Sequence, residues 1–406
     1  MRTRGGDYRP VAPAAPVVPA GPCAPIGPFG AARPYIIGKL LCPINEDKIK
    51  YSIYTTEIAD FGTMADTLLA QLPQSEQIFR LIFFGTPANN NEYVTRRNIL
   101  SDKIQQRYPQ KLPVLSYVSQ PALDGGLTME VHSYQADEND QIMYHPNEGF
   151  PYITLENADG RFLFAGGFHS DVLNFNTQQQ SVEVFRLASE VLHKENFPIE
   201  NIIRQWNYIE QITGFDGADQ HYQMFNNVRS NFYNQTTWSM GYPAATGIGS
   251  NLGGILVDID AAVFTRPECF ATPIDNKLQV AAHAYSPQVL EMAHQQKSTP
   301  KFERAKSMTF DDRQLIYISG TAAIRGEESL TGVGLERQLH ITMENIAQLT
   351  GDAHLKLLRV YLKDKSHYQE AYKLLNGYQL NIPISYMCAD VCRDELLIEI
   401  EGIAIK

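Results

Sequence analysis

The segment LLIEIEGIAI, residues 396–405, closes the chain with alternating side chains. In an extended strand Leu397, Glu399 and Glu401 share one face, whereas Ile398 and Ile400 share the other. A strand rises ~3.3 Å per residue, which places the two glutamates roughly 6.6 Å apart. Two carboxylates at that separation, among apolar neighbours, favour retention of one proton near neutral pH.

An acidic strand of the same kind lies near the middle of the chain, in GGILVDIDAAVF (residues 253–264). The segments before the two acidic strands also correspond in order: strand, helix, strand, helix. The first strands are RFLFAGGFHS (residues 161–170) and LIYISGTAAI (residues 315–324), and small residues in each favour a turn. The repeat predicts an α+β fold with two tandem domains, each a mixed sheet with helices packed on one face.

Composition divides the chain into four parts. Residues 1–34 are rich in proline and alanine, which is typical of a disordered tail. Residues 35–155 are predicted to form an α+β extension with a helix near residues 66–71, either a degenerate third unit or a cover over the first domain. The two repeated domains follow as residues 156–270 and 271–406, and the second carries the C-terminal acidic strand.

Length, composition and charge exclude several classes of protein. The 406 residues are 44% hydrophobic and 19% charged, which is typical of a globular chain of two or more domains. The net charge of −11, without a cluster of lysines and arginines, argues against nucleic-acid binding. No apolar run approaches the ~18 residues that a membrane helix needs. Five scattered cysteines favour reduced thiols and a cytoplasmic location: Cys23, Cys42, Cys269, Cys388 and Cys392.

Metal, phosphate and serine-hydrolase motifs are not found. Cys388 and Cys392 form a CxxxC without a second ligand pair, and the ten histidines show no HxH or HExxH spacing. The glycines of TGIGSNLGG (residues 246–254) precede a strand, whereas a phosphate loop opens a helix. No GxSxG elbow accompanies His169 and Asp171. We therefore expect neither a metal nor a cofactor.

The second repeat resembles the Rid-type imine deaminase family, the small YjgF-like fold, through YISGTAAI, VYLKD and LIEIEGIAI. The resemblance covers about residues 310–406 and, more weakly, residues 160–265. That family has an arginine early in the segment leading to its last strand, where this chain has Ile384 and Ser385, so deaminase activity is not expected. Because Rid-type proteins form trimers with sites between subunits, the tandem arrangement implies an internal mimic of that interface.

The whole of residues 150–406 resembles the chorismatase family, in which two such domains follow an N-terminal extension. The blocks that carry the resemblance are QWNYIEQI, HYQMFNNVRSNFY, YPAATGIGS, FERA and ADVCRDELLIEIEG, in that order. The resemblance implies removal of the enolpyruvyl group of chorismate as pyruvate. The ring product is either a dihydroxycyclohexadiene carboxylate or 3-hydroxybenzoate.

Chorismate carries two carboxylates, so its pocket needs at least two fixed cations, preferably arginines. Arg229, Arg304 and Arg393 each lie in a family-like block and are the candidates; the alternative for each is a surface salt bridge. Tyr208 and Tyr222 are candidate hydroxyl donors to the same carboxylates, with aromatic core packing as the alternative.

Cleavage of an enol ether needs a general acid that holds a proton at neutral pH. By resemblance, Glu399 occupies the position of the family's catalytic glutamate and Glu401 is structural. The alternative is a pair of strand carboxylates satisfied by loop amides. Thr246 either lines the ring pocket or caps a turn.

Two positions bear on the ring product. Seven residues before Glu399 the family has cysteine with the aromatic product and alanine with the hydrolytic one, and this chain has Cys392. A thiol or thiolate there would assist ring opening or proton removal; the alternative is an inert buried thiol. Ala305, at a second discriminating position, is of the hydrolytic type, and mixed patterns fit formation of both 3- and 4-hydroxybenzoate.

The sequence thus predicts a cofactor-independent chorismatase of secondary metabolism that releases pyruvate and 3-hydroxybenzoate, with 4-hydroxybenzoate as a further product. The alternatives are a hydrolytic chorismatase and a non-catalytic Rid-like protein that binds an aromatic carboxylate. The partner is small-molecule chorismate, with no nucleic acid and no membrane, and the chain is a monomer or a trimer.

Overall fold

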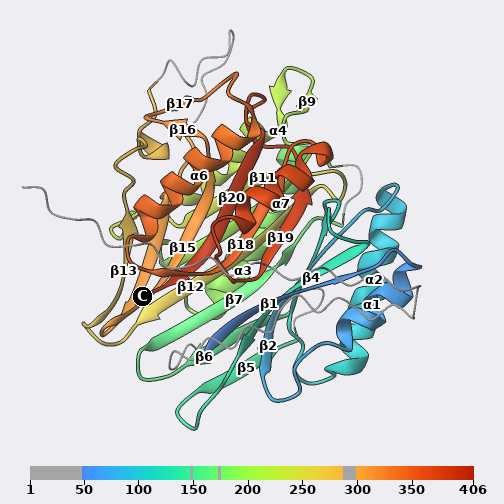
Figure 1. The fold of residues 1–406 in the computed structure, drawn as a ribbon. Coiled ribbons are helices and arrows are strands. Elements are labelled where there is room, and N and C mark those ends of the chain that lie inside the picture. Colours follow the sequence, from blue (N-terminus) through green and yellow to red (C-terminus); the bar gives the residue numbers. More distant parts are fainter. Residues whose placement is uncertain (1–47, 147–149, 172–174, 287–298) are drawn as a thin grey trace, which may run out of the picture. The chain divides into compact units, whose positions relative to one another are not determined.

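A computed structural model describes residues 48–146, 150–171, 175–286 and 299–406 of the chain (Figure 1). The tail predicted for residues 1–34 lies outside the described residues.

Three six-element units follow one another, and we name them by position. The N-terminal unit comprises β1 (Ile49–Thr56), α1 (Phe61–Leu69), β2 (Gln77–Gly85), α2 (Asn90–Arg107), β3 (Val114–Ser119) and β4 (Leu127–Tyr134). The middle unit comprises β7 (Gly160–Phe168), α3 (Thr177–Lys194), β8 (Ile202–Glu210), α4 (His221–Tyr233), β11 (Ala244–Ser250) and β12 (Ile255–Phe264). The C-terminal unit comprises β15 (Arg313–Ala322), α6 (Gly334–Thr350), β18 (His354–Leu362), α7 (Tyr368–Asn376), β19 (Ile384–Cys388) and β20 (Ile398–Ile405).

Two units have additional strands at the edge of the sheet. Strands β5 (Gln141–His145) and β6 (Tyr152–Glu156) extend the middle sheet beyond β7, so this sheet begins before residue 156. Strands β13 (Cys269–Ile274) and β14 (Ala305–Phe310) extend the C-terminal sheet beyond β15. The small elements are β9 (Phe215–Asp216), β10 (Asp219–Gln220), β16 (Ile324–Arg325), β17 (Glu328–Ser329) and the 3-10 turns η1 (Ile199–Asn201), η2 (Ala282–Ala284) and η3 (Lys365–His367).

The strand order is the same in all three sheets. It is β1-β4-β2-β3 in the N-terminal unit, β7-β12-β8-β11 in the middle unit and β15-β20-β18-β19 in the C-terminal unit. In each, the last strand lies antiparallel between the first and the second, and the second and third strands are parallel because a helix connects them. The mixed sheets confirm the predicted α+β fold, and the N-terminal unit repeats the topology of the other two.

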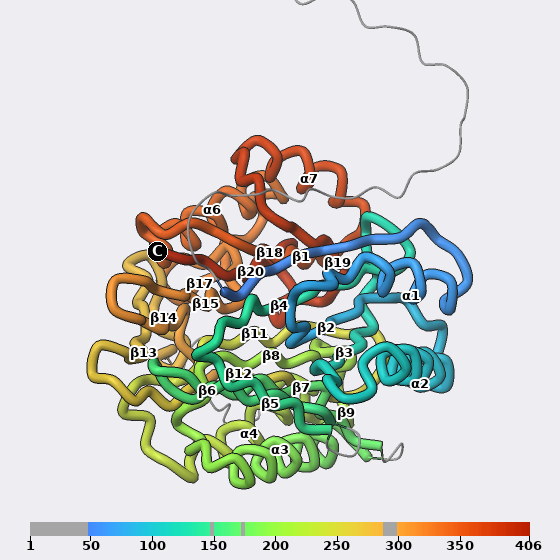
Figure 2. Tube along the Cα trace, turned by 90° about the horizontal axis from the view of Figure 1, so that it is seen from below, coloured from blue at the N-terminus to red at the C-terminus, as the bar shows by residue number. Residues whose placement is uncertain are grey.

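Each sheet is buried on both faces. The outer faces carry the helix pairs α1/α2, α3/α4 and α6/α7, as Figure 2 shows, and each pair encloses its own apolar core. The inner faces share one further cluster, to which Phe79, Trp206 and Tyr317 contribute from the three units. Residues from all three units therefore meet at the inner faces, where polar side chains are also found.

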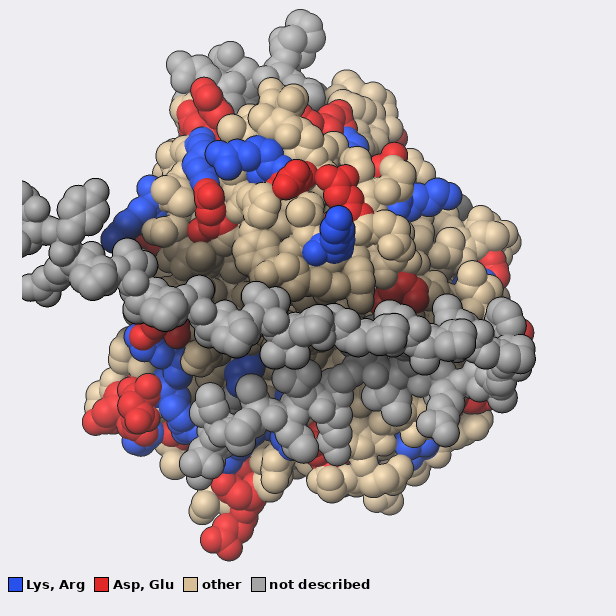
Figure 3. Space-filling model, in the orientation of Figure 1, with Lys and Arg blue, Asp and Glu red and all other residues tan. Residues whose placement is uncertain are grey.

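Charges of both signs are mixed on the visible surface. On the face in Figure 3, lysines and arginines are interspersed with acidic residues. No helix in the described ranges is both long and apolar enough to cross a membrane.

Candidate active site

The two glutamates of the C-terminal strand lie on the inner face of their sheet. Glu399 and Glu401 are 5% and 2% exposed, whereas Ile398 and Ile400 pack in the core beneath α6 and α7. Strand β20 lies between β15 and β18. Glu399 is paired with both neighbours, whereas the pairing with β15 is irregular beside Glu401. The alternation read from the sequence places both acids on one buried face.

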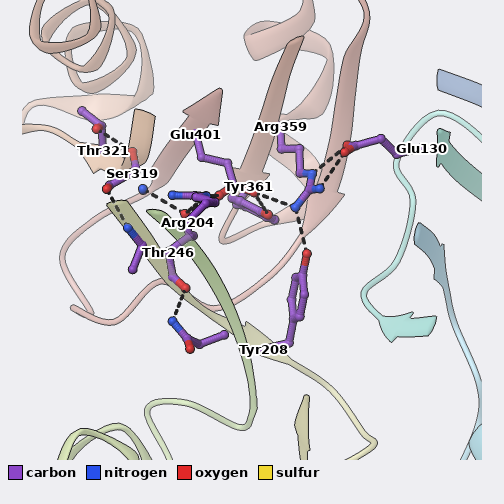
Figure 4. A network of polar contacts seen from close by, with 12 residues as sticks. Glu130, Arg204, Tyr208, Thr246, Ser319, Thr321, Arg359, Tyr361 and Glu401 are labelled. Carbon is purple, nitrogen blue, oxygen red and sulfur yellow. Dashed lines mark hydrogen bonds and ion pairs between the residues drawn. The ribbon is translucent and has the colours of Figure 1, made fainter. Parts of the chain in front are cut away.

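Glu401 is surrounded by donors (Figure 4). One carboxylate oxygen accepts hydrogen bonds from Arg204 and from the Thr246 hydroxyl. The other accepts from Arg359 at 2.9 Å and from the Tyr361 hydroxyl at 2.7 Å. Two arginines and two hydroxyl donors thus hold the Glu401 carboxylate, a fixed negative charge, in place.

Glu399 has the opposite environment. Among the described residues no hydrogen bond reaches its carboxyl group. Burial, followed by the charge of Glu401, raises the pKa of Glu399 to about 8, against the opposing charges of Arg304, Arg204 and Arg393. With that pKa, about nine tenths of the molecules hold the proton at pH 7. Glu399 is thus a carboxylic acid, rather than a carboxylate, at neutral pH.

A glycine allows Glu399 to occupy this position. Gly320 lies at an irregularity in the pairing of β15 with β20. A Cβ atom on Gly320 would stand 2.0 Å from Oε1 of Glu399 and 3.1 Å from Cγ2 of Thr246. The Gly320 amide donates a 3.0 Å hydrogen bond to the Thr246 hydroxyl, so the backbone itself forms one wall beside the acid.

Two of the three arginines chosen from the sequence act on this acid, and the third acts on its neighbour Tyr222. Arg304 and Arg393 act on the pKa of both Glu399 and Cys392, and their guanidinium groups lie 5.4 and 5.3 Å from the Tyr285 ring centroid. Arg229, on α4, acts on the pKa of Tyr222, as do Cys392 and Glu399.

None of these three arginines pairs with a carboxylate within the described residues. Arg229 donates to the Asn226 side chain, and its Nε has no partner. Arg304 donates to the Val280 carbonyl and the Tyr285 hydroxyl. Arg393 donates to the Glu327 carbonyl and the Ser329 hydroxyl. Three arginines without a carboxylate partner, two near Glu399 and one near Tyr222, favour an anionic ligand.

Of the remaining candidates, Cys392 and Tyr222 lie near Glu399, whereas Tyr208 and Ala305 have other surroundings. Burial, followed by the charge of Glu399, raises the pKa of Cys392 to about 12, so this residue is a thiol at neutral pH. Burial also raises the pKa of Tyr222 to about 12. Tyr208 is not brought to Glu399: its hydroxyl accepts a 2.8 Å hydrogen bond from Arg359. Ala305 is fully buried in the core that contains α6.

Sequence reasoning missed the arginines that hold Glu401. Arg204 and Arg359 lie in β8 and β18, the second strands of their units, within IIRQW and LLRVY. An arginine at the same point of two otherwise apolar strands is the signal that would have found them, because a buried arginine requires an acidic partner.

Comparisons with known proteins find similarity to chorismatases. The family model described as "Chorismatase FkbO/Hyg5-like, N-terminal" matches residues 137–260. A 3-hydroxybenzoate synthase of Streptomyces hygroscopicus is 26% identical over 274 residues, which are 61% of this chain and 75% of that protein. A chorismatase of Streptomyces rapamycinicus is 25% identical over 223 residues, 50% of this chain and 64% of that protein.

By sequence, the chain is similar to a 3-hydroxybenzoate synthase over 61% of its length and to a chorismatase over 50%. A crystal structure of a chorismatase shares its fold, with a TM-score of 0.62 and 19% identity over 88% of this chain and 98% of that one. The residues that match the family model, 137–260, contain Arg229, Tyr222 and Thr246. Glu399 and Cys392 lie beyond them, in the C-terminal unit.

Proposed function

We propose that the chain cleaves the enolpyruvyl ether of chorismate to pyruvate and 3-hydroxybenzoate, with 4-hydroxybenzoate as a further product. The observation that carries the proposal is that one site combines a protonated, buried Glu399 with three arginines that have no carboxylate partner among the described residues. The names of the relatives, 3-hydroxybenzoate synthase and chorismatase, support the same reaction.

The arginines fit the substrate. Chorismate is a dianion, and its ring and enolpyruvyl carboxylates lie at different ends of the molecule. Arg304 and Arg393 lie near Glu399, while Arg229 approaches from the middle unit through α4. Guanidinium groups bind carboxylates with two parallel hydrogen bonds, so they also fix the orientation of the ether relative to the acid.

The acid step follows from the protonation state of Glu399. Its proton passes to the terminal methylene carbon of the enol ether, and the adjacent carbon becomes an oxocarbenium-like electrophile. The fixed charge of Glu401 stabilises this cation. The neighbouring ring hydroxyl then displaces the side chain, and the resulting epoxide opens and aromatises. Chorismate is divided into pyruvate and hydroxybenzoate without a net uptake of water.

Cys392 is proposed to direct the ring chemistry. Incubation of the protein with chorismate should release pyruvate, followed enzymatically, and 3-hydroxybenzoate, followed by chromatography and mass. In Cys392→Ala we expect pyruvate release to persist while the ring product shifts towards the dihydroxycyclohexadiene carboxylate, because the thiol no longer assists proton removal.

Cys388→Ala is the matched control, because the Cys388 thiol lies 3.8 Å from the Lys363 carbonyl and is not among the neighbours of Glu399. An unchanged ring product in Cys392→Ala would reject the role of Cys392. Release of the dihydroxycyclohexadiene carboxylate by the unaltered protein would give the deciding role to the pocket around Ala305 and favour the hydrolytic alternative. If the protein bound chorismate but released no pyruvate, the alternative of a non-catalytic binding protein would be favoured.

Gly320→Ala should inactivate the enzyme without unfolding it. The new methyl group would stand 2.0 Å from the Glu399 carboxyl oxygen, so the acid must move. We expect kcat to fall at least about 100-fold, since a misplaced general acid loses most of its contribution. Circular dichroism and thermal unfolding would verify the fold. Gly326→Ala is a control in open space, although its φ of +61° costs some stability. Full activity in Gly320→Ala would contradict the placement of Glu399.

The assembly state does not alter the proposal. The residues named in the proposal belong to a single chain, and the choice between a monomer and a trimer remains a prediction. The cytoplasmic location and the role in secondary metabolism remain predictions.

A further inference from the structure

Three arginines from the three units meet at one tryptophan. Arg80 on β2, Arg204 on β8 and Arg359 on β18 occupy the second strand of their units. Their guanidinium carbons lie 4.8, 4.7 and 5.5 Å from the Trp206 ring centroid. All three are at most 2% exposed, so each needs an acidic partner in the interior.

The acidic partners form a closed cycle through the units. Arg80 of the N-terminal unit pairs with Asp260 of the middle unit at 2.8 Å. Arg204 of the middle unit pairs with Glu401 of the C-terminal unit. Arg359 of the C-terminal unit pairs with Glu130 of the N-terminal unit at 2.6 Å. The arginine of each unit thus pairs with an acidic residue of the next unit in the cycle, and three positive charges are balanced by three negative ones.

Arg359 is shared between two carboxylates (Figure 4). Its Nε and Nη2 donate to Glu130 at 2.7 and 2.6 Å, and its Nη1 donates to Glu401 at 2.9 Å. Although burial by itself raises the pKa of Glu130, the charge and hydrogen bonds of Arg359 hold that pKa at about 2. Glu130 is therefore ionised at any working pH and neutralises the cation that touches Glu401.

We propose that Glu130 of the N-terminal unit is a positioning residue for the reaction: by holding Arg359, it leaves Glu401 as an effective negative neighbour of Glu399. This inference rests on the proposed function and gives a role to residues 35–155, to which the sequence assigned no chemistry. Within the described part of the chain, Glu130 makes no hydrogen bond or ion pair with Glu399 or with the three arginines of the proposed substrate site, so its effect passes through Arg359 and Glu401.

The sign of the effect follows from the charges around the two acids. The groups that act on Glu399 are Glu401, Arg204, Arg304, Arg393, Cys392 and Tyr222. The groups around Glu130 are Arg359, His132 and Tyr208. Without the Glu130 charge, Arg359 is a full positive charge beside Glu401. Interior positive charge favours the ionised form of Glu399, so the protonated acid is lost at lower pH.

The test is the pH dependence of pyruvate release in Glu130→Gln. In the wild type the general acid is lost as pH rises through about 8, the pKa of Glu399. In the variant we expect this alkaline limb to move down by about one pH unit, which lowers the ratio of activity at pH 8 to activity at pH 6 about five-fold. A defect in folding alone would lower both activities and leave the ratio unchanged.

Two further variants serve as controls for this test. Glu130→Gln combined with Arg359→Gln removes both charges, and we expect the alkaline limb to return towards pH 8. Should Glu130→Gln not fold, Glu130→Asp keeps the charge with a shorter reach and is expected to keep the wild-type limb. An unmoved limb in Glu130→Gln would overturn the inference, as would a failure of the double variant to restore it.

A direct titration separates this inference from the proposed function. The infrared band of the protonated Glu399 carboxyl group, identified by its absence in Glu399→Gln, can be followed against pH without substrate. The band should titrate at lower pH in Glu130→Gln even if the wild type releases no pyruvate. Absence of pyruvate would then reject the reaction, and an unshifted band would reject the role of Glu130.

Discussion

Glu399→Gln is expected to abolish pyruvate release from chorismate, with kcat at least about 1,000-fold below that of the wild type. The amide matches the shape of the protonated carboxyl group but has no proton acidic enough for the enol ether. The fold should persist, because Glu399 is mostly uncharged at pH 7 and gives up no hydrogen bond among the described residues. Single-turnover pyruvate assays would measure the loss.

Chorismate binding is the control for this variant, and the dissociation constant from calorimetry should change less than about three-fold, since the arginines remain. Glu401→Gln provides the contrast, because it removes a charge held by Arg204 and Arg359 and should destabilise the protein by about 3–5 kcal/mol. Pyruvate release at the wild-type rate in Glu399→Gln would move the acid role to another residue.

Arg304→Met should have two effects that act on activity in opposite directions. Substrate binding should weaken, and activity should persist to higher pH. We expect KM for chorismate to rise about 100-fold, the usual size of a lost buried contact between a guanidinium and a carboxylate. Arg304 also lowers the pKa of Glu399, so its removal should move the alkaline limb above pH 8. Steady-state kinetics between pH 6 and pH 9 would show both effects.

Arg266→Met is a suitable control, because Arg266 is already neutralised by Asp159 and Asp311 on the surface. Its KM should equal that of the wild type. If Arg304→Met left KM unchanged, the role of Arg304 would be to hold Tyr285 and the Val280 carbonyl rather than to bind an anion.

Local patterns were sufficient to predict the C-terminal strand. The period of two in LLIEIEGIAI assigns Glu399 and Glu401 to one face, and the matching order of elements predicts strand, helix, strand, helix and acidic strand in the second and third units. It omits β11 and β19, which follow the second helix of each unit. Helix α2 was missed because its surface is mostly polar: only Tyr93, Leu100 and Ile104 are buried along 18 residues. The predicted helix near residues 66–71 corresponds to α1, which begins earlier, at Phe61, where Asp60 caps it.

The polar interior could not be predicted because its contacts are long-range. Arg80 and Asp260 are 180 residues apart, Arg204 and Glu401 are 197 apart, and Arg359 and Glu130 are 229 apart. No periodicity within one strand reports such pairs. Likewise, the close approach of Gly320 to Glu399 depends on two strands that are far apart in sequence.

The equivalent strand registers of the three units have a consequence for how such a chain can diverge. Glu130, Asp258 and Glu399 occupy the same position, each opposite the residue two places after the arginine of the second strand. Glu130 holds a cation, Asp258 accepts bonds from the Ser116 hydroxyl and the Gly167 amide, and Glu399 stays protonated. In a ring of identical chains one mutation would alter all three places together. Covalent fusion lets each copy drift separately, so two can specialise in stability while the third acquires chemistry.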